Sequence, residues 1–300
     1  FKCDWSSDVC SSDLITGASG FIGKRLTVRL RAEGHGVIPV SFRGASDAAA
    51  KDVETVAKKI EGCAAVIHLA GEPVAQRWTD ASKKRILESR EKGTRLIVDA
   101  IGKLEQKPKL LISASGVGYY GSRGDEVLTE TSAPGSDFLA EVCKAWEAEA
   151  RKAEAFGVRV VNPRIGVVLG SDGGALEKML LPFRLGVGGK IGSGAQWTAW
   201  IHVDDLISLI VFALKESELR GPVNAAAPNP VTNAEFTKAL ASALHRPAIF
   251  PVPGFALKMA MGEMSEMLLG GQRVIPEAAQ AAGFRFRYPK LADALKEILP

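Results

Sequence analysis

The chain has 300 residues, 46% of them hydrophobic and 24% charged, with a formal net charge of +4. This length fits one α/β core with a smaller lobe, and the composition is that of an ordinary soluble globular protein. The absence of a basic block and of any long apolar run in the sequence argues against nucleic acid and membrane partners.

Four cysteines, at positions 3, 10, 63 and 143, show no metal-ligand spacing. From this spacing we expect no metal site. Because no secretory signal is visible in the sequence, we expect a reducing, cytoplasmic compartment.

Residues 1–13 do not fit the rest of the chain. Ser and Asp dominate until Leu14, whereas a nucleotide-binding sheet needs a buried first strand rich in β-branched residues. We interpret 1–13 as a non-native leader, such as translated vector or adaptor sequence. A native reading frame running through these codons at the genomic locus would refute that hypothesis.

A strand, a glycine turn and a helix come directly after the leader. The turn has the spacing G-x-x-G-x-x-G at Gly17, Gly20 and Gly23, and an amphipathic helix runs from there to Gly34. Glycines let a pyrophosphate approach the backbone, and the free N–H groups at a helix start favour an anion. The stretch therefore predicts a dinucleotide site.

The second strand, 37–42, favours NADP(H) as the cofactor. NAD-preferring folds place a carboxylate near the tip of this strand, but here the tip carries Ser41 and Arg43. A hydroxyl and a guanidinium suit the 2′-phosphate of NADP.

Further elements alternate as a doubly wound fold requires. We expect strands at 64–69, 110–113, 158–161 and 219–225, and helices at 53–60, 80–104 and 137–156. The fold class is α/β: a Rossmann-like doubly wound parallel sheet with a smaller C-terminal α/β substrate lobe. The expected division is 14–165 for the dinucleotide domain, rejoined by 200–225, and 166–300 mostly for the lobe, including a family-specific segment at 249–297.

The predicted site lies at the carboxyl ends of these strands. The expected cofactor contacts are Gly17, Ser19, Gly20, Phe21, Ile22, Gly23, Ser41, Arg43, Leu69, Ala70, Gly71, Ser113 and Arg164. The candidate catalytic residues are Ser115, Tyr119, Tyr120 and Arg90.

Several motifs together resemble the extended short-chain dehydrogenases/reductases. They are the glycine turn, Val66–Ala70, Ser113–Ser115 and Trp200–Asp205. Arg77–Thr79, Gly118–Gly121, Phe138–Cys143 and Gly186–Trp200 are similar to an atypical epimerase-family subgroup, whose C-terminal domain of unknown function resembles 249–297. The resemblance implies a nicotinamide cofactor and a small-molecule substrate, in a monomer or homodimer.

The sequence departs from that family at the proton relay. Family members with known chemistry use Ser or Thr with Tyr-x-x-x-Lys and a supporting Asn, in which the Tyr is the acid/base. Here Ser115 matches the Ser, but the Tyr and Lys positions hold Leu139 and Cys143, and Arg90 replaces the Asn.

Two interpretations of this departure stay open. In the first, the protein is an NADP-dependent oxidoreductase or epimerase-like enzyme with a rebuilt site. Tyr119 or Tyr120 is then the acid/base, and Arg90 or Arg77 supplies positive charge toward an anionic substrate. In the second, the protein is a non-catalytic NADPH-binding redox sensor or regulatory protein.

Overall fold

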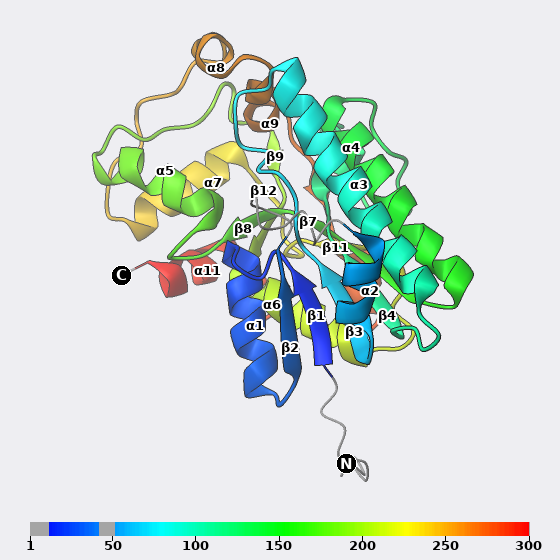
Figure 1. Cartoon of the computed structure of the whole chain (residues 1–300). Helices are drawn as coiled ribbons and strands as arrows, with labels where there is room; N and C mark the ends of the chain where they lie inside the picture. Colours follow the sequence, from blue (N-terminus) through cyan, green and yellow to red (C-terminus); the bar gives the residue numbers. More distant parts are fainter. Residues whose placement is uncertain (1–11, 42–51, 300) are drawn as a thin grey trace.

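A computed structural model describes residues 12–41 and 52–299 (Figure 1). Its central sheet has the strand order β2-β1-β3-β4-β7-β11, β5 pairs with β7, and every pairing is parallel. The strands are β1 (Ser12–Thr16), β2 (Gly36–Val40), β3 (Cys63–His68), β4 (Leu110–Ser113), β5 (Ser115–Gly116), β7 (Arg159–Ile165) and β11 (Gly221–Ala225).

Helices cover both faces of this sheet. The buried apolar residues of α1 (Phe21–Ala32) and α6 (Val203–Lys215) pack on one face. Those of α2 (Val53–Ile60), α3 (Asp80–Lys103) and α4 (Phe138–Arg151) pack on the other. From β1 the chain passes to β2 on one side and then to β3 on the other, so the switch point for a ligand lies at the carboxyl ends of β1 and β3. The predicted fold class is confirmed.

A second lobe, built on short pairs of strands, stands beside the sheet. The pairs are β8 (Val167–Leu169) with β10 (Trp200–His202), β9 (Trp197–Thr198) with β12 (Val231–Thr232), and β6 (Val127–Leu128) with β13 (Arg273–Val274). Its helices are α5 (Gly174–Arg184), α7 (Asn233–Ala243), α8 (Gly254–Met261), α9 (Glu266–Leu269) and α11 (Leu291–Ile298), whereas α10 (Glu277–Ala281) packs against the core of the central sheet through Ala279.

One apolar cluster holds this lobe together. It joins Leu176 of α5, Phe236 of α7 and Leu295 of α11 around Trp200, which is fully buried. None of the helices in the described part of the chain has the length and apolar character needed to span a bilayer.

Strand β1 begins earlier than the sequence suggests. Ser12 and Asp13, which the residue pattern places in the leader, pair with both β2 and β3. Backbone pairing needs no apolar side chain, so the strand extends through two polar residues. Asp13 is only 2% exposed and lies 2.7 Å from Nδ1 of His35. Burial raises the pKa of its carboxyl, against the opposing effect of His35. Residues 1–11 lie outside the described part.

Candidate functional site

The glycine turn forms a tight cradle at the carboxyl end of β1. Gly17 has φ +73°, and a Cβ there would lie 3.0 Å from the backbone of Leu69 and Ala70. A Cβ on Gly23 would overlap the carbonyl oxygen of Gly17. Helix α1 therefore starts as close to the turn as the backbone permits, and only glycine fits at these positions.

The N-terminus of α1 is open to a ligand. Its N-cap, Gly20, supplies no side-chain hydrogen bond, and the first turn carries no acidic residue. The positive end of the helix dipole is therefore not neutralised by the helix's own side chains. Ser19 and Gly20 are exposed at this point. This arrangement suits an anion such as a pyrophosphate.

The end of β3 is tied to the cradle. The N–H of Leu69 donates to the carbonyl of Thr16 at 3.2 Å, and the N–H of Ala70 donates to the Thr16 hydroxyl at 3.2 Å. Leu69, Ala70 and Gly71 thus line the switch point next to Gly17. Ser113 ends β4 beside them; it is fully buried, and its hydroxyl has no hydrogen-bond partner among the described residues. An unpaired hydroxyl at this edge fits a polar ligand group.

Phe21 and Ile22 serve packing in this structure. Phe21 lies against the glycines of the loop after β8, where a Cβ on Gly173 would overlap its ring. Arg25 stacks on the same ring at 4.7 Å and forms an ion pair with Asp172 of that loop. Ile22 packs against the core cluster under α1. The loop 170–174 is thereby fastened over the start of α1.

The tip of the second strand is only partly described. Ser41 follows β2 directly and is exposed, next to the cradle strand β1. Arg43 lies outside the described residues, so its predicted contact with a 2′-phosphate stays a prediction.

Arg90 lies on α3 and is 8% exposed. Its Nη1 donates to the carbonyl oxygens of Glu72 at 3.0 Å and Ile86 at 3.1 Å, and the guanidinium stacks on Trp146 with 4.8 Å to the ring centre. Burial lowers the pKa of the guanidinium. Burial, and then the charge of Arg90, lower the pKa of His68 to about 4, so that imidazole is neutral at pH 7.

A buried network collects three of the other predicted residues. Arg164 donates from Nε and Nη2 to the two carboxylate oxygens of Glu147 at 2.8 Å each, and the Ser115 hydroxyl donates to Glu147 at 2.7 Å. Tyr120 accepts from Arg164 at 2.9 Å and donates to Asn224 at 2.6 Å. The side chains of Ser115, Tyr120 and Arg164 are thus hydrogen-bonded to other side chains of the protein.

The two tyrosines differ in their surroundings. Tyr120 is fully buried, and its burial raises the phenol pKa to about 12, although Arg164 and Asn224 oppose the shift. Tyr119 is half-buried, and the guanidinium of Arg164 lies 3.4 Å from its ring centre. Of the pair, Tyr119 is the less buried residue, and it has a cation against its ring.

The positions of the family's Tyr and Lys are filled by packing side chains. Leu139 lies over Gly118, where an added Cβ would be 3.0 Å from the leucine. Cys143 is buried against Ser115 and Gly116, and burial raises the pKa of its thiol to about 11. A thiol in this state is a poor nucleophile, so we assign it to packing.

A hollow of about 630 Å³ opens beside Leu139. Its walls come from the loop after Gly118, from the start of α4 and from the segment around α8 and α9. Its lining includes Trp78, Arg123, Phe138, Lys258 and Met267. Aromatic, aliphatic and charged groups of both signs therefore meet there, as in many small-molecule pockets.

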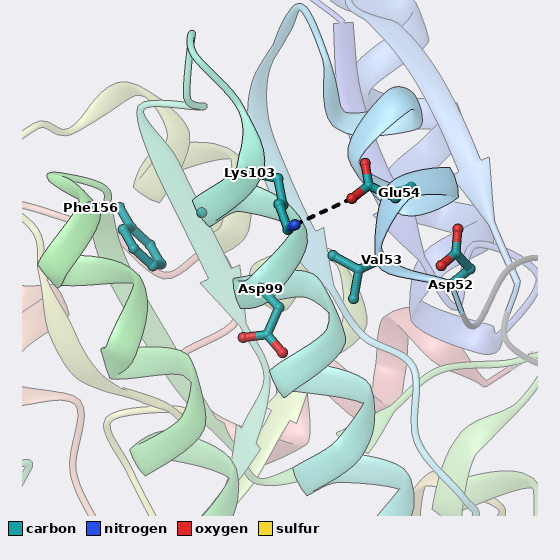
Figure 2. Close-up of a pocket in the computed structure, with 7 residues that line it drawn as sticks. Asp52, Val53, Glu54, Asp99, Lys103 and Phe156 are labelled. Atoms are coloured by element: carbon teal, nitrogen blue, oxygen red, sulfur yellow. Dashed lines mark ion pairs between the residues drawn. The ribbon is translucent and has the colours of Figure 1, made fainter.

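A second hollow, of about 490 Å³, has none of the predicted site residues of the described chain in its lining (Figure 2). It is lined by Asp52 and Glu54 at the N-terminal end of α2, by Asp99 and Lys103 of α3, and by Phe156. Lys103 pairs with Glu54 at 3.3 Å, and both side chains are exposed. An open, charged hollow of this kind is a common surface feature.

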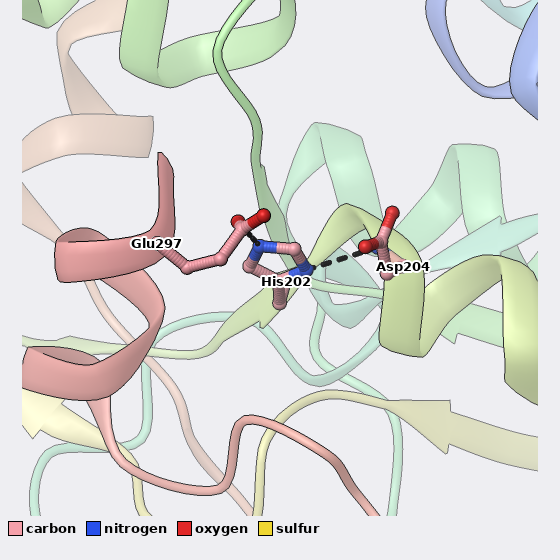
Figure 3. A group of neighbouring side chains, drawn as sticks. All are labelled: His202, Asp204 and Glu297. Atoms are coloured by element: carbon pink, nitrogen blue, oxygen red, sulfur yellow. Dashed lines mark hydrogen bonds and ion pairs between the residues drawn. The ribbon is translucent and has the colours of Figure 1, made fainter. Parts of the chain in front are cut away.

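The junction of β10 and α6 carries a polar trio, His202, Asp204 and Glu297 (Figure 3). Nδ1 of His202 accepts the N–H of Asp204 at 3.1 Å, so Nε2 carries the proton and donates to Glu297 at 2.8 Å. Asp205 accepts the N–H groups of Arg287 and Tyr288 at 2.8 and 2.9 Å. These bonds cap α6 and fasten the C-terminal segment to it.

The sequence did not point to Glu147, Asn224 or Asp172. Each acts through a partner far along the chain, and Asn224 lies 104 residues from Tyr120. A carboxylate one turn after Cys143, on the apolar face of α4, was the only signal in the sequence for Glu147.

Comparison with known proteins places these features in a family. Residues 14–226 match the model of the NAD dependent epimerase/dehydratase family, and residues 252–298 match a domain of unknown function, DUF1731. The Arabidopsis thaliana epimerase family protein SDR39U1 homolog, chloroplastic, is 46% identical, across 95% of this chain and 86% of that protein. The Bacillus subtilis epimerase family protein YfhF is 42% identical, across 95% of this chain and 97% of that protein.

A solved structure supports the same assignment. The crystal structure of human epimerase family protein SDR39U1 with NADPH has a TM-score of 0.87 at 38% identity, and covers 96% of this chain and 98% of that one. The resemblance seen in the motifs is therefore confirmed, including its C-terminal domain. The chain belongs to the NAD dependent epimerase/dehydratase family.

Proposed function

We propose that this protein binds NADP(H) in the glycine cradle and acts on a small molecule in the 630 Å³ hollow. The reaction class is oxidoreductase or epimerase-like, without a Tyr-x-x-x-Lys relay. The observation that carries the proposal is the cradle itself, where Gly17 and Gly23 exclude any Cβ and the α1 N-terminus is uncapped. The human relative crystallised with NADPH supports the choice of cofactor.

The described residues fit a dinucleotide. The open start of α1 suits the pyrophosphate, and the unpaired Ser113 hydroxyl suits a polar group further along the sheet edge. When bound, the nicotinamide supplies or accepts hydride. We assign proton exchange to Tyr119, because it is half-buried over Arg164, whereas Tyr120, which borders the hollow, is fully buried and its hydroxyl is bonded to Asn224.

Cofactor preference is tested by thermal shift with NADPH and NADH. We expect NADPH to stabilise the protein more, and Arg43→Ala to remove the difference. Equal shifts for both nucleotides in the natural chain would contradict the NADP assignment.

The second candidate function is a non-catalytic NADPH-binding sensor. Specific contacts favour it: the Ser115 hydroxyl donates to Glu147, and Tyr120 lies fully buried between Arg164 and Asn224. Tyr119→Phe separates the two functions. For an enzyme it abolishes turnover and leaves NADPH affinity intact, whereas for a sensor it changes neither binding nor the response to the nucleotide.

A further inference from the structure

Arg90 is a buried cation that forms no ion pair with any acidic residue in the described part of the chain. It is 8% exposed, and its two hydrogen bonds go to main-chain carbonyl oxygens, those of Glu72 and Ile86. Within residues 12–41 and 52–299, no carboxylate forms an ion pair with it at 4 Å or less. Buried guanidinium groups are normally paired, so the positive charge at this position is uncompensated.

The guanidinium faces the edge of the sheet that we assign to the cofactor. A Cβ on Gly71 would lie 3.1 Å from Cζ of Arg90, so the group lies directly behind the Leu69–Gly71 stretch. It also stacks on Trp146 of α4, and its charge acts on Cys143, which stands at the Lys position of related oxidoreductases. The cation therefore lies beside the carboxyl end of β3, next to the stretch that we assign to the cofactor.

Nearby charges do not cancel it. Glu147 is a buried acid of α4 close to Cys143, and it accepts hydrogen bonds from Nε and Nη2 of Arg164, so that pair is neutral as a unit. The charge of Glu72 acts on Arg90, but this carboxylate is half-exposed, lies 3.8 Å from Arg85, and has a smaller effect on the pKa of Arg90 than burial has. The field of Arg90 at the sheet edge is therefore that of a weakly screened positive charge.

The two redox forms of the cofactor differ in one charge. NADPH and NADP⁺ carry the same phosphates, but the oxidised nicotinamide ring is a cation and the reduced ring is neutral. We propose that Arg90 makes this site selective for NADPH over NADP⁺, so that occupancy of the protein follows the redox state of the cofactor pool. This inference rests on the proposed NADP(H) binding and adds to it a preference for the reduced form of the cofactor.

The size of the effect comes from Coulomb's law. Two unit charges about 10 Å apart at an effective dielectric of about 20 repel enough to change affinity on the order of tenfold. The attraction of Arg90 for phosphate acts on both forms alike, so it cancels in the ratio of the two dissociation constants. That ratio, rather than either affinity, isolates the effect on the ring.

The test is calorimetric titration of the full chain with NADPH and with NADP⁺. The natural protein binds NADPH about tenfold more tightly, Arg90→Gln brings the two affinities close together, and Arg90→Lys keeps the preference because it keeps the charge. Lys92→Gln is the matched control. It removes an exposed cation, paired with Glu88, from the same helix and leaves the ratio unchanged.

Each outcome decides a different point. Equal affinities in the natural protein, or a preference that survives Arg90→Gln, overturn the role of Arg90. The measurement on the natural protein stands even where Arg90→Gln does not fold. Absence of binding by both nucleotides instead refutes the proposed function.

Discussion

Glu147 accepts two hydrogen bonds of 2.8 Å from Arg164, and both side chains are 2% exposed. The pair links α4 to β7, and through it the Ser115 hydroxyl and the Tyr120 phenol are held in one network. Ser115 and Tyr120, which the sequence suggests for catalysis, are thus part of a buried hydrogen-bond network that links elements of the fold.

We expect Glu147→Gln to destabilise the fold by about 3–5 kcal/mol, because it leaves a buried guanidinium without its counter-ion. Urea unfolding followed by circular dichroism measures the change. Lys103→Gln is the control, since the Lys103–Glu54 pair is exposed, and it should cost less than about 1 kcal/mol. Similar decreases in unfolding free energy in both variants would show that the buried Arg164–Glu147 pair contributes no more to stability than the exposed pair.

Tyr120→Phe removes a hydroxyl that donates to Asn224 and accepts from Arg164. We expect a loss of about 1–3 kcal/mol in unfolding free energy, because buried partners are left unsatisfied. Tyr119→Phe keeps its ring on Arg164 and should change stability much less. The idea fails if the two substitutions cost the same.

The same phenol has a pH signature. Its folded pKa is raised to about 12, above the unfolded value of 10.0, so the folded state prefers the protonated form. Stability is unaffected below about pH 10 and falls as the pH rises from there toward 12. Ultraviolet titration of the three tyrosines should show a late ionisation step that Tyr120→Phe removes. A late step that persists in the variant would assign it to another tyrosine.

Asp13 is a buried carboxyl in a central strand, and its pKa is raised mainly by burial. The ionised form therefore costs stability, and stability is regained as the pH falls through the folded pKa. Asp13→Val should stabilise the protein by about 1–2 kcal/mol at pH 7, because it removes the cost of burying a carboxylate while the His35 side chain, 22% exposed, still reaches solvent. Chemical unfolding at pH 7 and at acid pH measures both effects, and a destabilised variant would mean that the Asp13–His35 pair outweighs burial.

Gly23→Ala tests the cradle. The added methyl group would overlap the Gly17 carbonyl, so α1 must shift away from the turn. We expect loss of NADPH binding and a stability cost of about 1–3 kcal/mol. In Gly93→Ala, an added Cβ lies 3.8 Å from His68 in an ordinary contact, so that variant should be neutral or gain up to about 1 kcal/mol. Affinity for NADPH is measured by fluorescence titration. Unchanged affinity in Gly23→Ala would show that the glycine cradle is not part of the binding site.

Features that depend on local pattern could be predicted from the sequence. The turn at Gly17–Gly23 and the alternation of strands and helices are encoded in glycine spacing and apolar periodicity, and the structure contains them. The partners of Ser115, Tyr120 and Arg164 could not be predicted, because hydrogen-bond pairing across tens of residues leaves no local pattern. The start of β1 was also missed by two residues, since Asp13 owes its place to backbone pairing and to His35.

The backbone N–H groups of Arg287 and Tyr288 donate to Asp205, and His202 bonds to Glu297. These bonds join the C-terminal segment 287–297 to the start of α6, the helix that covers one face of the sheet. Leu291 and Leu295 complete the same apolar cluster as Leu176 and Phe236. The two regions matched by separate family models therefore share one interior. Cutting the chain between them would uncover that interior on both fragments, so we expect the DUF1731 region to fold together with the rest of the chain rather than as a portable module.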